Sequence, residues 1–304
     1  MSSAALGNRA AMEGYPCGWQ WEREGADWPL RAASTRVECA GLSWHVQRLG
    51  EPAAGPTVLL LHGTFSSTHS WSGLAPRLAR HCQVLMPDLP GHGWTFGARR
   101  EDMAMTTMAG KLLALLRALG VAPEVIVGHS AGAALAVSMA LNSSAVRVLS
   151  LNGALLPLAG LGGKLYAPAA QLLQFVPGLA RFSAWRSARS DVVDRLLEST
   201  GSQLGPAEVH WYRRLASDPG HVAAVMEMMA RWDLAGFAHR LAGYQGRLEL
   251  IAGSRDTTVP ASELRRIVVR VPQAKCHVLR DLGHLAHEED PETVAKLVLG
   301  LLGR

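Results

Sequence analysis

The stretch from Val125 to Ala136 constrains the fold of this 304-residue chain more than any other. Three β-branched residues at its start predict a buried strand, and the alanine-rich sequence after Gly132 predicts a helix. Between them lies the pattern Gly128-x-Ser130-x-Gly132. A strand can pass into a helix this sharply only if the turn residue adopts strained dihedral angles and its neighbours are small. The pattern therefore predicts a strand–turn–helix unit that exposes the Ser130 hydroxyl, although a small-residue junction without chemistry would look similar.

Apolar runs of strand length alternate with helical segments on both sides of this unit. A hairpin over 35–47, with its turn at Ala40-Gly41, is expected at an exposed edge. This alternation predicts a mostly parallel sheet with right-handed crossovers. The expected strands are 57–61, 83–86, 125–127, 146–151, 247–252 and 276–279, and those at 57–61, 125–127 and 146–151 are expected to be buried. The clearest helices are 105–119, 262–271 and the one that starts at Pro291.

The alternation stops between residues 154 and 243, where prolines interrupt short apolar helical segments and no strand is predicted. This stretch is too long for a loop, so we expect a helical insertion. The expected division is an N-terminal arm over 1–34, a core over 35–153 and 244–304, and a helical cap over 154–243. Tryptophans in the arm predict that it packs on the domain or on a partner.

Composition excludes several classes of function. Hydrophobic residues make up 48% of the chain and charged ones 18%, which predicts a globular protein with a sizeable core. The net charge of +5 is not arranged in basic runs with aromatics, so we expect no nucleic acid partner. No apolar run is long enough to span a membrane and no signal pattern is present, which favours a cytoplasmic location. The scattered cysteines Cys17, Cys39, Cys82 and Cys276 predict a reduced protein without a metal site, and no cofactor is expected.

Four candidate groups follow predicted strands: His62-Gly63-Thr64, Ser130, Asp256 and His284. Ligands of parallel sheets bind at the carboxyl ends of the strands, so we expect these groups to meet at one edge. Their order along the chain, serine before aspartate before histidine, is that of a nucleophile elbow with its acid and base. The order strengthens the interpretation of Ser130 as a nucleophile.

Each candidate has a chemical role. His284 can remove the Ser130 proton during attack and return it to the leaving group, and Asp256 can fix the histidine tautomer. The backbone N–H groups of Thr64 and Ala131 are expected to form the oxyanion hole. Asp256 could instead be only a helix cap or turn residue.

Other polar residues compete for these roles. Asp281 is a rival acid, but it lies three residues before the candidate base and fits a turn. His287 is a rival base at the acidic start of the last helix. His62 and His92 fit buried loop anchors, and His129 could either contact substrate or fill space.

The residues from about Trp28 to the C-terminus resemble the α/β-hydrolase superfamily. The landmarks are His62-Gly63, Pro87–Gly93, Gly128–Gly132, Asp256 and Gly283-His284. The chain is more similar to one branch, the magnesium-chelatase accessory α/β-hydrolases of bacteriochlorophyll biosynthesis. The stretches behind that similarity are Trp28-Pro29, Trp44–Gln47, Gly128–Ala134, Ser150–Pro157, Thr200–Ser202, Pro219–Val222 and Met228–Leu234. The resemblance implies an α/β-hydrolase fold, with a mostly parallel sheet flanked by helices and a helical cap or lid.

The sequence therefore predicts a serine hydrolase that cleaves a carboxylic ester through an acyl-enzyme. The resemblance implies a small-molecule substrate, with a tetrapyrrole intermediate as the contextual candidate. Two alternatives stay open: a non-catalytic porphyrin-binding accessory protein, and a cofactor-free peroxidase or C–C hydrolase with the same triad. Phe65, His129 and Leu155 are expected to line the substrate pocket.

The cap carries basic residues that suggest anionic partners. Arg181, Arg186 and Arg189 would suit the propionates of a tetrapyrrole or anionic lipid headgroups, and they could equally form a solvated helix face. For the protein as a whole, the resemblance implies contact with magnesium chelatase or with the surface of the inner membrane.

Overall fold

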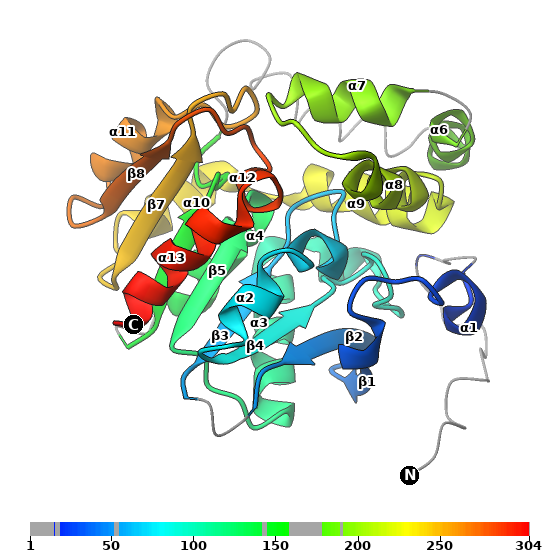
Figure 1. Cartoon of the computed structure of the whole chain (residues 1–304), viewed down its shortest axis with the longest axis horizontal. Helices are drawn as coiled ribbons and strands as arrows, with labels where there is room; N and C mark the ends of the chain where they lie inside the picture. The colour runs from blue at the N-terminus through cyan, green and yellow to red at the C-terminus, as the bar shows by residue number, and fades with distance from the viewer. Residues whose placement is uncertain are drawn as a thin grey trace.

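A central sheet of eight strands organises the computed structural model, in the order β1-β2-β4-β3-β5-β6-β7-β8 (Figure 1). The structure describes residues 15, 19–51, 55–141, 145–157, 178–188 and 191–303. β3 to β8 run parallel, whereas β2 is antiparallel to both β1 and β4. The strands are β1 Ser34–Cys39, β2 Leu42–Leu49, β3 Thr57–Leu61, β4 Gln83–Pro87, β5 Val125–His129, β6 Arg147–Leu151, β7 Leu248–Gly253 and β8 Lys275–Leu279. The prediction of a mostly parallel sheet with one antiparallel edge hairpin is confirmed.

Local sequence explains several element boundaries. Ala40 and Gly41 both have positive φ, which matches the turn to the twist of the hairpin strands. Asp290 caps the last helix by accepting a hydrogen bond from the Thr293 N–H, and Pro291 occupies the first helical position. The α-helices are α1 Trp21–Glu24, α2 Ala75–Leu78, α3 Met105–Ala118, α4 Ala131–Ala140, α6 Leu179–Ser187, α7 Val192–Ser199, α8 Pro206–Ala216, α9 Pro219–Arg231, α10 Leu234–Leu241, α11 Glu263–Val268, α12 Ala286–Glu289 and α13 Pro291–Leu302, and the short 3-10 helices are η1 Arg31–Ala33, η3 Thr68–Trp71 and η4 Arg100–Met103.

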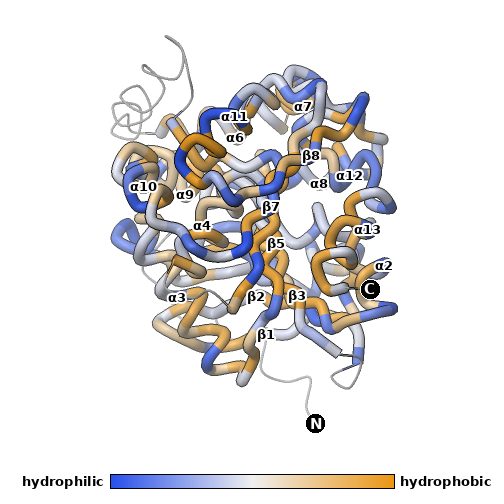
Figure 2. The backbone as a smooth tube through the Cα atoms, turned by 90° about the vertical axis from the view of Figure 1, so that its left-hand side faces the viewer, coloured by the Kyte–Doolittle hydropathy of each residue, from blue (hydrophilic) through white to orange (hydrophobic). Residues whose placement is uncertain are grey.

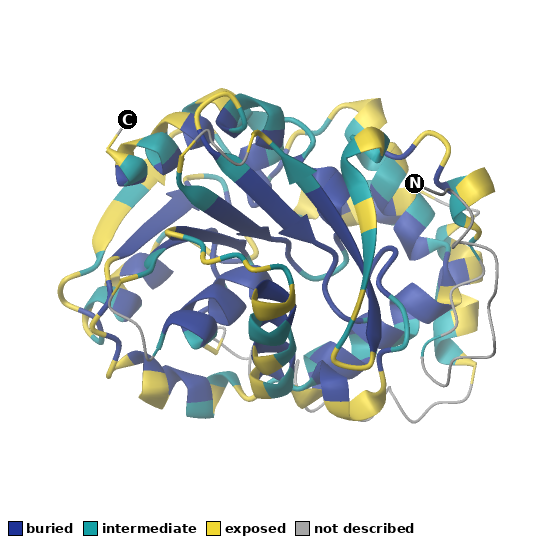
Figure 3. Ribbon diagram, turned by 90° about the horizontal axis from the view of Figure 1, so that it is seen from below, coloured by how far each residue is buried: buried dark blue, intermediate teal, exposed yellow. Residues whose placement is uncertain are grey.

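The sheet is covered on both faces. One apolar cluster packs α3, α4 and α10 on one face, and a second packs α2 and α13 on the other. Figure 2 shows the strands as a hydrophobic centre, and Figure 3 shows them buried among helices whose outer sides are exposed. A fully buried Leu or Val contributes roughly 1.5–3 kcal/mol relative to an exposed one, so the continuous apolar strands account for much of the stability.

The described residues between β6 and β7 form helices α6 to α10 with connecting loops and contain no strand. Helices α6, α7, α8 and α9 pack on one another above the carboxyl edge of the sheet (Figure 1). Phe237 and Leu241 of α10, like Ala224 and Met228 of α9, are buried in the core cluster that also contains α3 and α4 residues. The division into arm, core and cap, with the cap over 154–243, stays a prediction. None of the helices within the described ranges is long and apolar enough to cross a membrane.

Aromatic side chains tie the N-terminal arm to both the core and the cap. Trp28 of the arm and Trp94 of the core are buried with Leu215 of α8. The Trp28 ring also meets Trp211 of α8 edge-on, with 5.2 Å between ring centroids. Arg214 of α8 forms an ion pair with Asp27 of the arm at 2.7 Å and lies over the Trp211 ring. The arm therefore packs on the domain and holds α8 against it.

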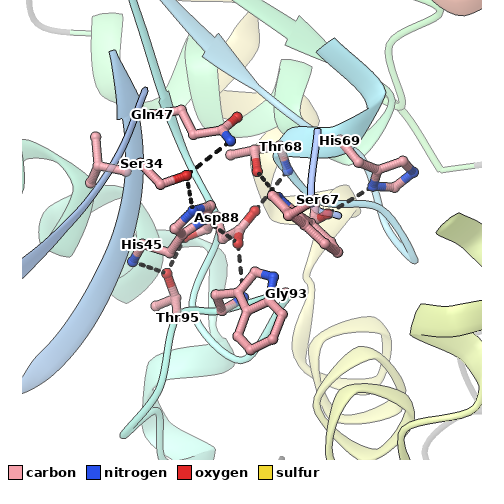
Figure 4. A network of polar contacts seen from close by, with 12 residues as sticks. Ser34, His45, Gln47, Ser67, Thr68, His69, Asp88, Gly93 and Thr95 are labelled. Atoms are coloured by element: carbon pink, nitrogen blue, oxygen red, sulfur yellow. Dashed lines mark hydrogen bonds and ion pairs between the residues drawn. The ribbon is translucent and has the colours of Figure 1, made fainter. Parts of the chain in front are cut away.

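A buried carboxylate joins the antiparallel edge to the loops at the carboxyl end of the sheet (Figure 4). Asp88, at the end of β4, accepts hydrogen bonds from His45 Nδ1 of β2 at 2.8 Å and from the backbone N–H groups of Thr68 and Trp94 at 2.7 and 2.8 Å. Burial alone would raise the pKa of the Asp88 carboxyl, but the neighbouring His45 and these hydrogen bonds hold it well below its usual value. The folded state thus keeps this carboxylate charged.

Replacing Asp88 by Asn should destabilise the fold by about 3 kcal/mol near neutral pH, because the amide removes the charge and turns one acceptor into a donor. Urea unfolding measures the loss, with the exposed Asp281→Asn as the matched control. Since the folded pKa is lowered, the stabilisation is complete above the ordinary aspartate value of 3.8 and disappears as the pH falls through the folded value. Equal unfolding free energies for both variants at neutral pH would contradict this role.

Candidate active site

Ser130 occupies the turn between β5 and α4 and has φ 51° and ψ −116°. A non-glycine residue in such a conformation costs about 1–3 kcal/mol, so the surroundings must hold it there. Its N–H donates to the Leu151 carbonyl at 3.0 Å, and its own carbonyl accepts hydrogen bonds from the N–H groups of Ala133 and Ala154. Its neighbours in β5 and α4 are buried, whereas Ser130 itself is partly exposed. The strained turn predicted from the sequence is therefore present.

The two glycines that flank the turn are required by close backbone packing. A Cβ atom at Gly128 would lie 2.3 Å from the Gly132 carbonyl oxygen, and one at Gly132 would lie 2.2 Å from the Leu61 carbonyl oxygen. Real Cβ contacts are never this short. The small-residue requirement thus arises from contacts between strand and helix and between the helix and the end of β3.

Asp256 and His284 meet at the carboxyl ends of β7 and β8. His284 Nδ1 lies 2.8 Å from Asp256 Oδ2, and Asn152 Nδ2 donates to the same oxygen at 2.7 Å. The other oxygen, Oδ1, accepts hydrogen bonds from the N–H groups of Thr258 and Val259, both at 2.8 Å. Because a carboxylate only accepts hydrogen bonds, the hydrogen-bond network assigns the ring proton to Nδ1 and leaves Nε2 as the basic nitrogen.

Asn152 helps to hold the candidate acid and base, and the sequence did not predict this role. It follows β6, is fully buried, and has φ 48°. Its side chain also donates to the Gly283 carbonyl at 3.2 Å, so it holds the loop of the base as well as the acid. The signal in the sequence was the Asn152-Gly153 pair at the end of a predicted strand. Such a pair indicates a backbone turn with positive φ, but it does not indicate which residues the asparagine side chain binds.

Ser130 and His284 lie at the same edge of the sheet, and no direct hydrogen bond joins them among the residues that the structure describes. The link between their loops is His129, whose Nε2 lies 2.9 Å from the His284 carbonyl oxygen and whose ring centroid is 4.8 Å from that of His284. Hydrogen bonds between nucleophile and base are often long in unliganded enzymes. The structure therefore brings acid and base together and places the serine next to the residue that contacts the base.

The two amides predicted for the oxyanion hole flank Ser130. Ala131 begins α4, where the first N–H groups have no acceptor within the helix. Thr64 follows Gly63, and a Cβ atom at that glycine would lie 3.1 Å from the Ser130 Cβ. Phe65 adopts a positive φ of 60°. These positions are compatible with an oxyanion hole, and that role stays a prediction.

The expected pocket residues differ in how much surface they offer. Phe65 is half-buried, and its ring centroid lies 6.1 Å from that of His221 in α9. Leu155 is buried in the core cluster, and His129 is buried against the loop of the base. Of the cap arginines, Arg181 and Arg186 are exposed on α6, and Arg189 lies outside the described residues, as does Cys17.

The structure also places the rival residues. Asp281 is exposed in a turn with φ 61°, which fits its interpretation as a turn residue. His287 is buried against Trp71 with 4.4 Å between ring centroids, and burial lowers its pKa to about 3. His62 Nδ1 bonds the adjacent Gly63 carbonyl at 2.8 Å, and its Nε2 accepts a hydrogen bond from the Leu89 N–H at 2.9 Å. Both histidines therefore serve as neutral, buried anchors.

A loop of the cap, residues 200–203, contacts both the acid loop and the base loop. Ser202 Oγ accepts a hydrogen bond from the Leu285 N–H at 2.9 Å, directly after the candidate base. The Thr200 carbonyl accepts one from the Thr257 N–H, directly after the candidate acid, at 3.3 Å. Gly201 has φ 80°, and a Cβ atom there would lie 1.8 Å from the Arg255 carbonyl oxygen. The sequence had singled out Thr200–Ser202 only as part of a family resemblance.

The buried carboxylate of Glu289 also joins the cap loop 200–203 to the acid and base loops. Its Oε1 accepts a hydrogen bond from the Gly283 N–H at 2.8 Å, and its Oε2 accepts one from the Gln203 N–H at 3.1 Å. The guanidinium of Arg255 lies 3.2 Å from Oε2. One side chain therefore joins the base loop, the cap loop and the residue before Asp256.

A second polar contact joins the cap to α12. The Tyr212 hydroxyl of α8 donates to Oε1 of the Glu288 carboxyl group. Burial, with smaller contributions from the nearby Glu208 and Glu289, raises the pKa of Glu288 to about 8, although the Tyr212 hydrogen bond lowers it. At neutral pH the folded protein thus holds this group mostly protonated.

Comparison with known proteins shows which family and which proteins this chain is similar to. Residues 58–297 match the model of the alpha/beta hydrolase family. The "Magnesium-chelatase 30 kDa subunit" of Rhodobacter capsulatus is 34% identical over 277 residues, which cover 91% of this chain and 97% of that protein. The "2-hydroxy-6-oxononadienedioate/2-hydroxy-6-oxononatrienedioate hydrolase 2" of Pseudomonas putida is 28% identical, over 90% and 96% of the two chains. A solved alpha/beta hydrolase fold protein from Burkholderia ambifaria superposes with a TM-score of 0.73 at 21% identity, over 88% and 97%.

Replacing Ser202 by Ala should loosen the loop of the base without unfolding the protein. The Leu285 amide loses its acceptor, so its hydrogen exchange should accelerate about fivefold, the equivalent of one ordinary hydrogen bond. Exchange measured by mass spectrometry or NMR tests this, and Ser199→Ala, an exposed serine of α7, is the matched control. Unchanged protection of Leu285 would show that the cap loop does not hold this segment.

The raised pKa of Glu288 predicts a pH dependence of stability with a definite sign. Between the ordinary value of 4.5 and about 8 the unfolded chain loses this proton while the folded protein keeps it. Stability should therefore decrease across that window as the pH rises. Glu288→Gln keeps a neutral group and should flatten this slope in thermal unfolding measured from pH 5 to 8. An identical slope in both proteins would exclude Glu288 as its source.

Proposed function

The chain belongs to the alpha/beta hydrolase family, and from this premise we propose that it is a serine hydrolase that cleaves a carboxylic ester with Ser130, His284 and Asp256. The observation that carries the proposal is the buried hydrogen bond between Asp256 and His284 at the strand ends. The strained serine turn at the same edge supports it further. The proposal assigns one role to each of these side chains.

In the proposed reaction, Ser130 Oγ attacks the ester carbonyl carbon while His284 Nε2 takes the hydroxyl proton. Asp256 keeps the other ring nitrogen protonated and stabilises the imidazolium that forms. The bond to the alcohol then breaks as His284 returns the proton to the leaving oxygen. Water attacks the acyl-enzyme with the same base, which releases the acid and restores the serine. The hydroxyl and ring must come within hydrogen-bond distance for the first step, an approach that substrate binding often produces.

The tetrahedral intermediate carries a negative oxygen that requires fixed donors. We assign this task to the backbone N–H groups of Thr64 and Ala131, which flank the serine. Loss of one such donor commonly costs about 3–4 kcal/mol of transition-state stabilisation. Because the donors are backbone groups, their placement depends on the turn after β3 and on the first turn of α4.

The substrate proposal rests on a relative. The R. capsulatus protein carries the name of a magnesium chelatase subunit, and its match covers 91% of this chain. We therefore propose an ester of a tetrapyrrole intermediate as the substrate, in association with bacteriochlorophyll biosynthesis. The P. putida relative, a hydrolase by name, keeps C–C bond hydrolysis by the same triad as a second candidate.

Ser130→Ala should abolish labelling by a fluorophosphonate probe and lower the turnover of a chromogenic short-chain ester at least about 10³-fold, because no other group supplies the nucleophile. Asp256→Asn should also reduce turnover strongly, since its amide can no longer orient the histidine. The modified residue is mapped by mass spectrometry, and Ser262→Ala, an exposed serine before α11, is the control.

The same measurements separate the alternatives. Absence of labelling in the wild-type protein, together with porphyrin binding that survives Ser130→Ala, would favour a non-catalytic binding protein. Labelling at Ser130 with turnover of a vinylogous diketone but not of esters would favour C–C hydrolysis, and turnover of peroxide would favour a peroxidase.

A further inference from the structure

Two buried histidines meet where the cap helix α9 packs on the loop after β4. His221 lies in the first turn of α9 and His92 lies in the loop, and their rings meet edge-on with 5.2 Å between the centroids. A Cβ atom at Gly91 would lie 2.6 Å from the Ala224 Cβ of α9, so the helix can approach the loop this closely only because residue 91 is a glycine. Both histidines are almost completely shielded from solvent. The two rings therefore lie in a tight junction between cap and core.

Both rings are neutral near physiological pH. Burial, with smaller contributions from nearby histidines, lowers the pKa of the His92 ring to about 3 and that of the His221 ring well below its usual value. A neutral imidazole has one N–H donor and one acceptor nitrogen. The pair can therefore offer hydrogen bonds to a ligand, but it offers no positive charge to an ionised carboxylate.

Each ring has one nitrogen with a partner and one without. The Gly93 N–H donates to His221 Nδ1 at 3.3 Å, so this ring carries its proton on Nε2. His92 Nδ1 lies 3.0 Å from the Pro90 carbonyl oxygen, which can only accept, so its proton is on Nδ1 and its Nε2 is an acceptor. Neither Nε2 atom has a hydrogen-bond partner among the residues that the structure describes. The junction thus holds one unpaired donor and one unpaired acceptor.

This histidine pair adjoins the turn that carries a predicted oxyanion donor. Phe65 follows Thr64 directly, and the centroid of its half-buried ring lies 6.1 Å from that of His221. The centroid of the His92 ring lies 5.3 Å from that of His62, at the start of the same turn. Native proteins give nearly every buried polar group a partner, which can be a water or a ligand. A ligand group bound at the histidine pair would consequently lie next to the candidate active site.

We propose that His221 Nε2 and His92 Nε2 form a subsite for a neutral hydroxyl group of the substrate, with His221 as donor and His92 as acceptor. A hydroxyl group accepts one hydrogen bond and donates another, so it satisfies both unpaired nitrogens. A methyl group satisfies neither, and an ionised carboxylate cannot donate to His92. Such a site discriminates against a substrate without the hydroxyl, because its buried polar groups then stay unpaired. The inference rests on the proposed ester hydrolysis at Ser130 and names a feature of its substrate.

Matched pairs of p-nitrophenyl esters test the proposal. In each pair the acyl chain ends in a hydroxyl or in a methyl group, and the series runs from short to medium chain length. In the wild-type protein, the ratio of kcat/KM for the hydroxyl ester to that for the methyl ester should peak at one chain length. His221→Leu should lower this peak ratio about tenfold because it removes the donor, and His92→Leu should lower it similarly because it removes the acceptor. His221→Gln should retain most of the ratio, since its amide can still donate, and the exposed His239→Leu should leave it unchanged.

The other possible results overturn the inference. A ratio that neither His221→Leu nor His92→Leu lowers at any chain length would mean that the pair holds a resident water only. Equal losses in His221→Leu and His221→Gln would assign to His221 only its contact with Gly93. Circular dichroism and thermal unfolding establish that each variant is folded.

The fluorophosphonate label separates failure of this inference from failure of the proposed function. Labelling at Ser130 without any preference for hydroxyl esters would overturn the hydroxyl subsite alone. Absence of both labelling and ester turnover in the wild-type protein would overturn the proposed hydrolysis, and the subsite with it.

Discussion

The hydrogen bond between the Asp256 carboxylate and the His284 ring is the interaction on which the site depends. It joins two loops that follow neighbouring parallel strands. The carboxylate accepts three further hydrogen bonds, one from the Asn152 side chain and two from the backbone N–H groups of Thr258 and Val259. A buried carboxylate is tolerated only when its oxygens are satisfied in this way. The same bonds that make its burial possible therefore also fix the orientation of the histidine.

The cap is connected to this pair and does more than cover it. Ser202 and Glu289 bind the backbone on both sides of His284, and the Thr200 carbonyl binds the backbone after Asp256. A movement of the cap loop would therefore displace the acid and base loops with it. The Trp28 and Trp211 contact adds a third point of attachment, since it holds α8 to the N-terminal arm. Access to the site and its internal geometry are coupled through these contacts.

Buried polar groups of the core also hold the loops at the carboxyl edge of the sheet, where the candidate site lies. Asp88 joins β2 to the Thr68 loop and to the loop after β4, and His62 fixes the start of the turn that carries Thr64. Each of these groups is fully buried, and each has partners from segments distant in sequence. The loops near Ser130 are consequently held by the fold as a whole, which is how a strained serine conformation can persist.

The sequence by itself determined the local features: the strands, the edge hairpin, the cap of the last helix, the glycine spacing around Ser130, and the order of serine, aspartate and histidine. These follow from periodicity and steric rules that act within a few residues. Tertiary structure alone decided that Asn152, Ser202 and Glu289 hold the acid and base, and that His129 contacts the His284 loop. Those contacts join residues far apart in the chain, and a buried donor or acceptor finds its partner only after the strands are aligned, so no local pattern can reveal it.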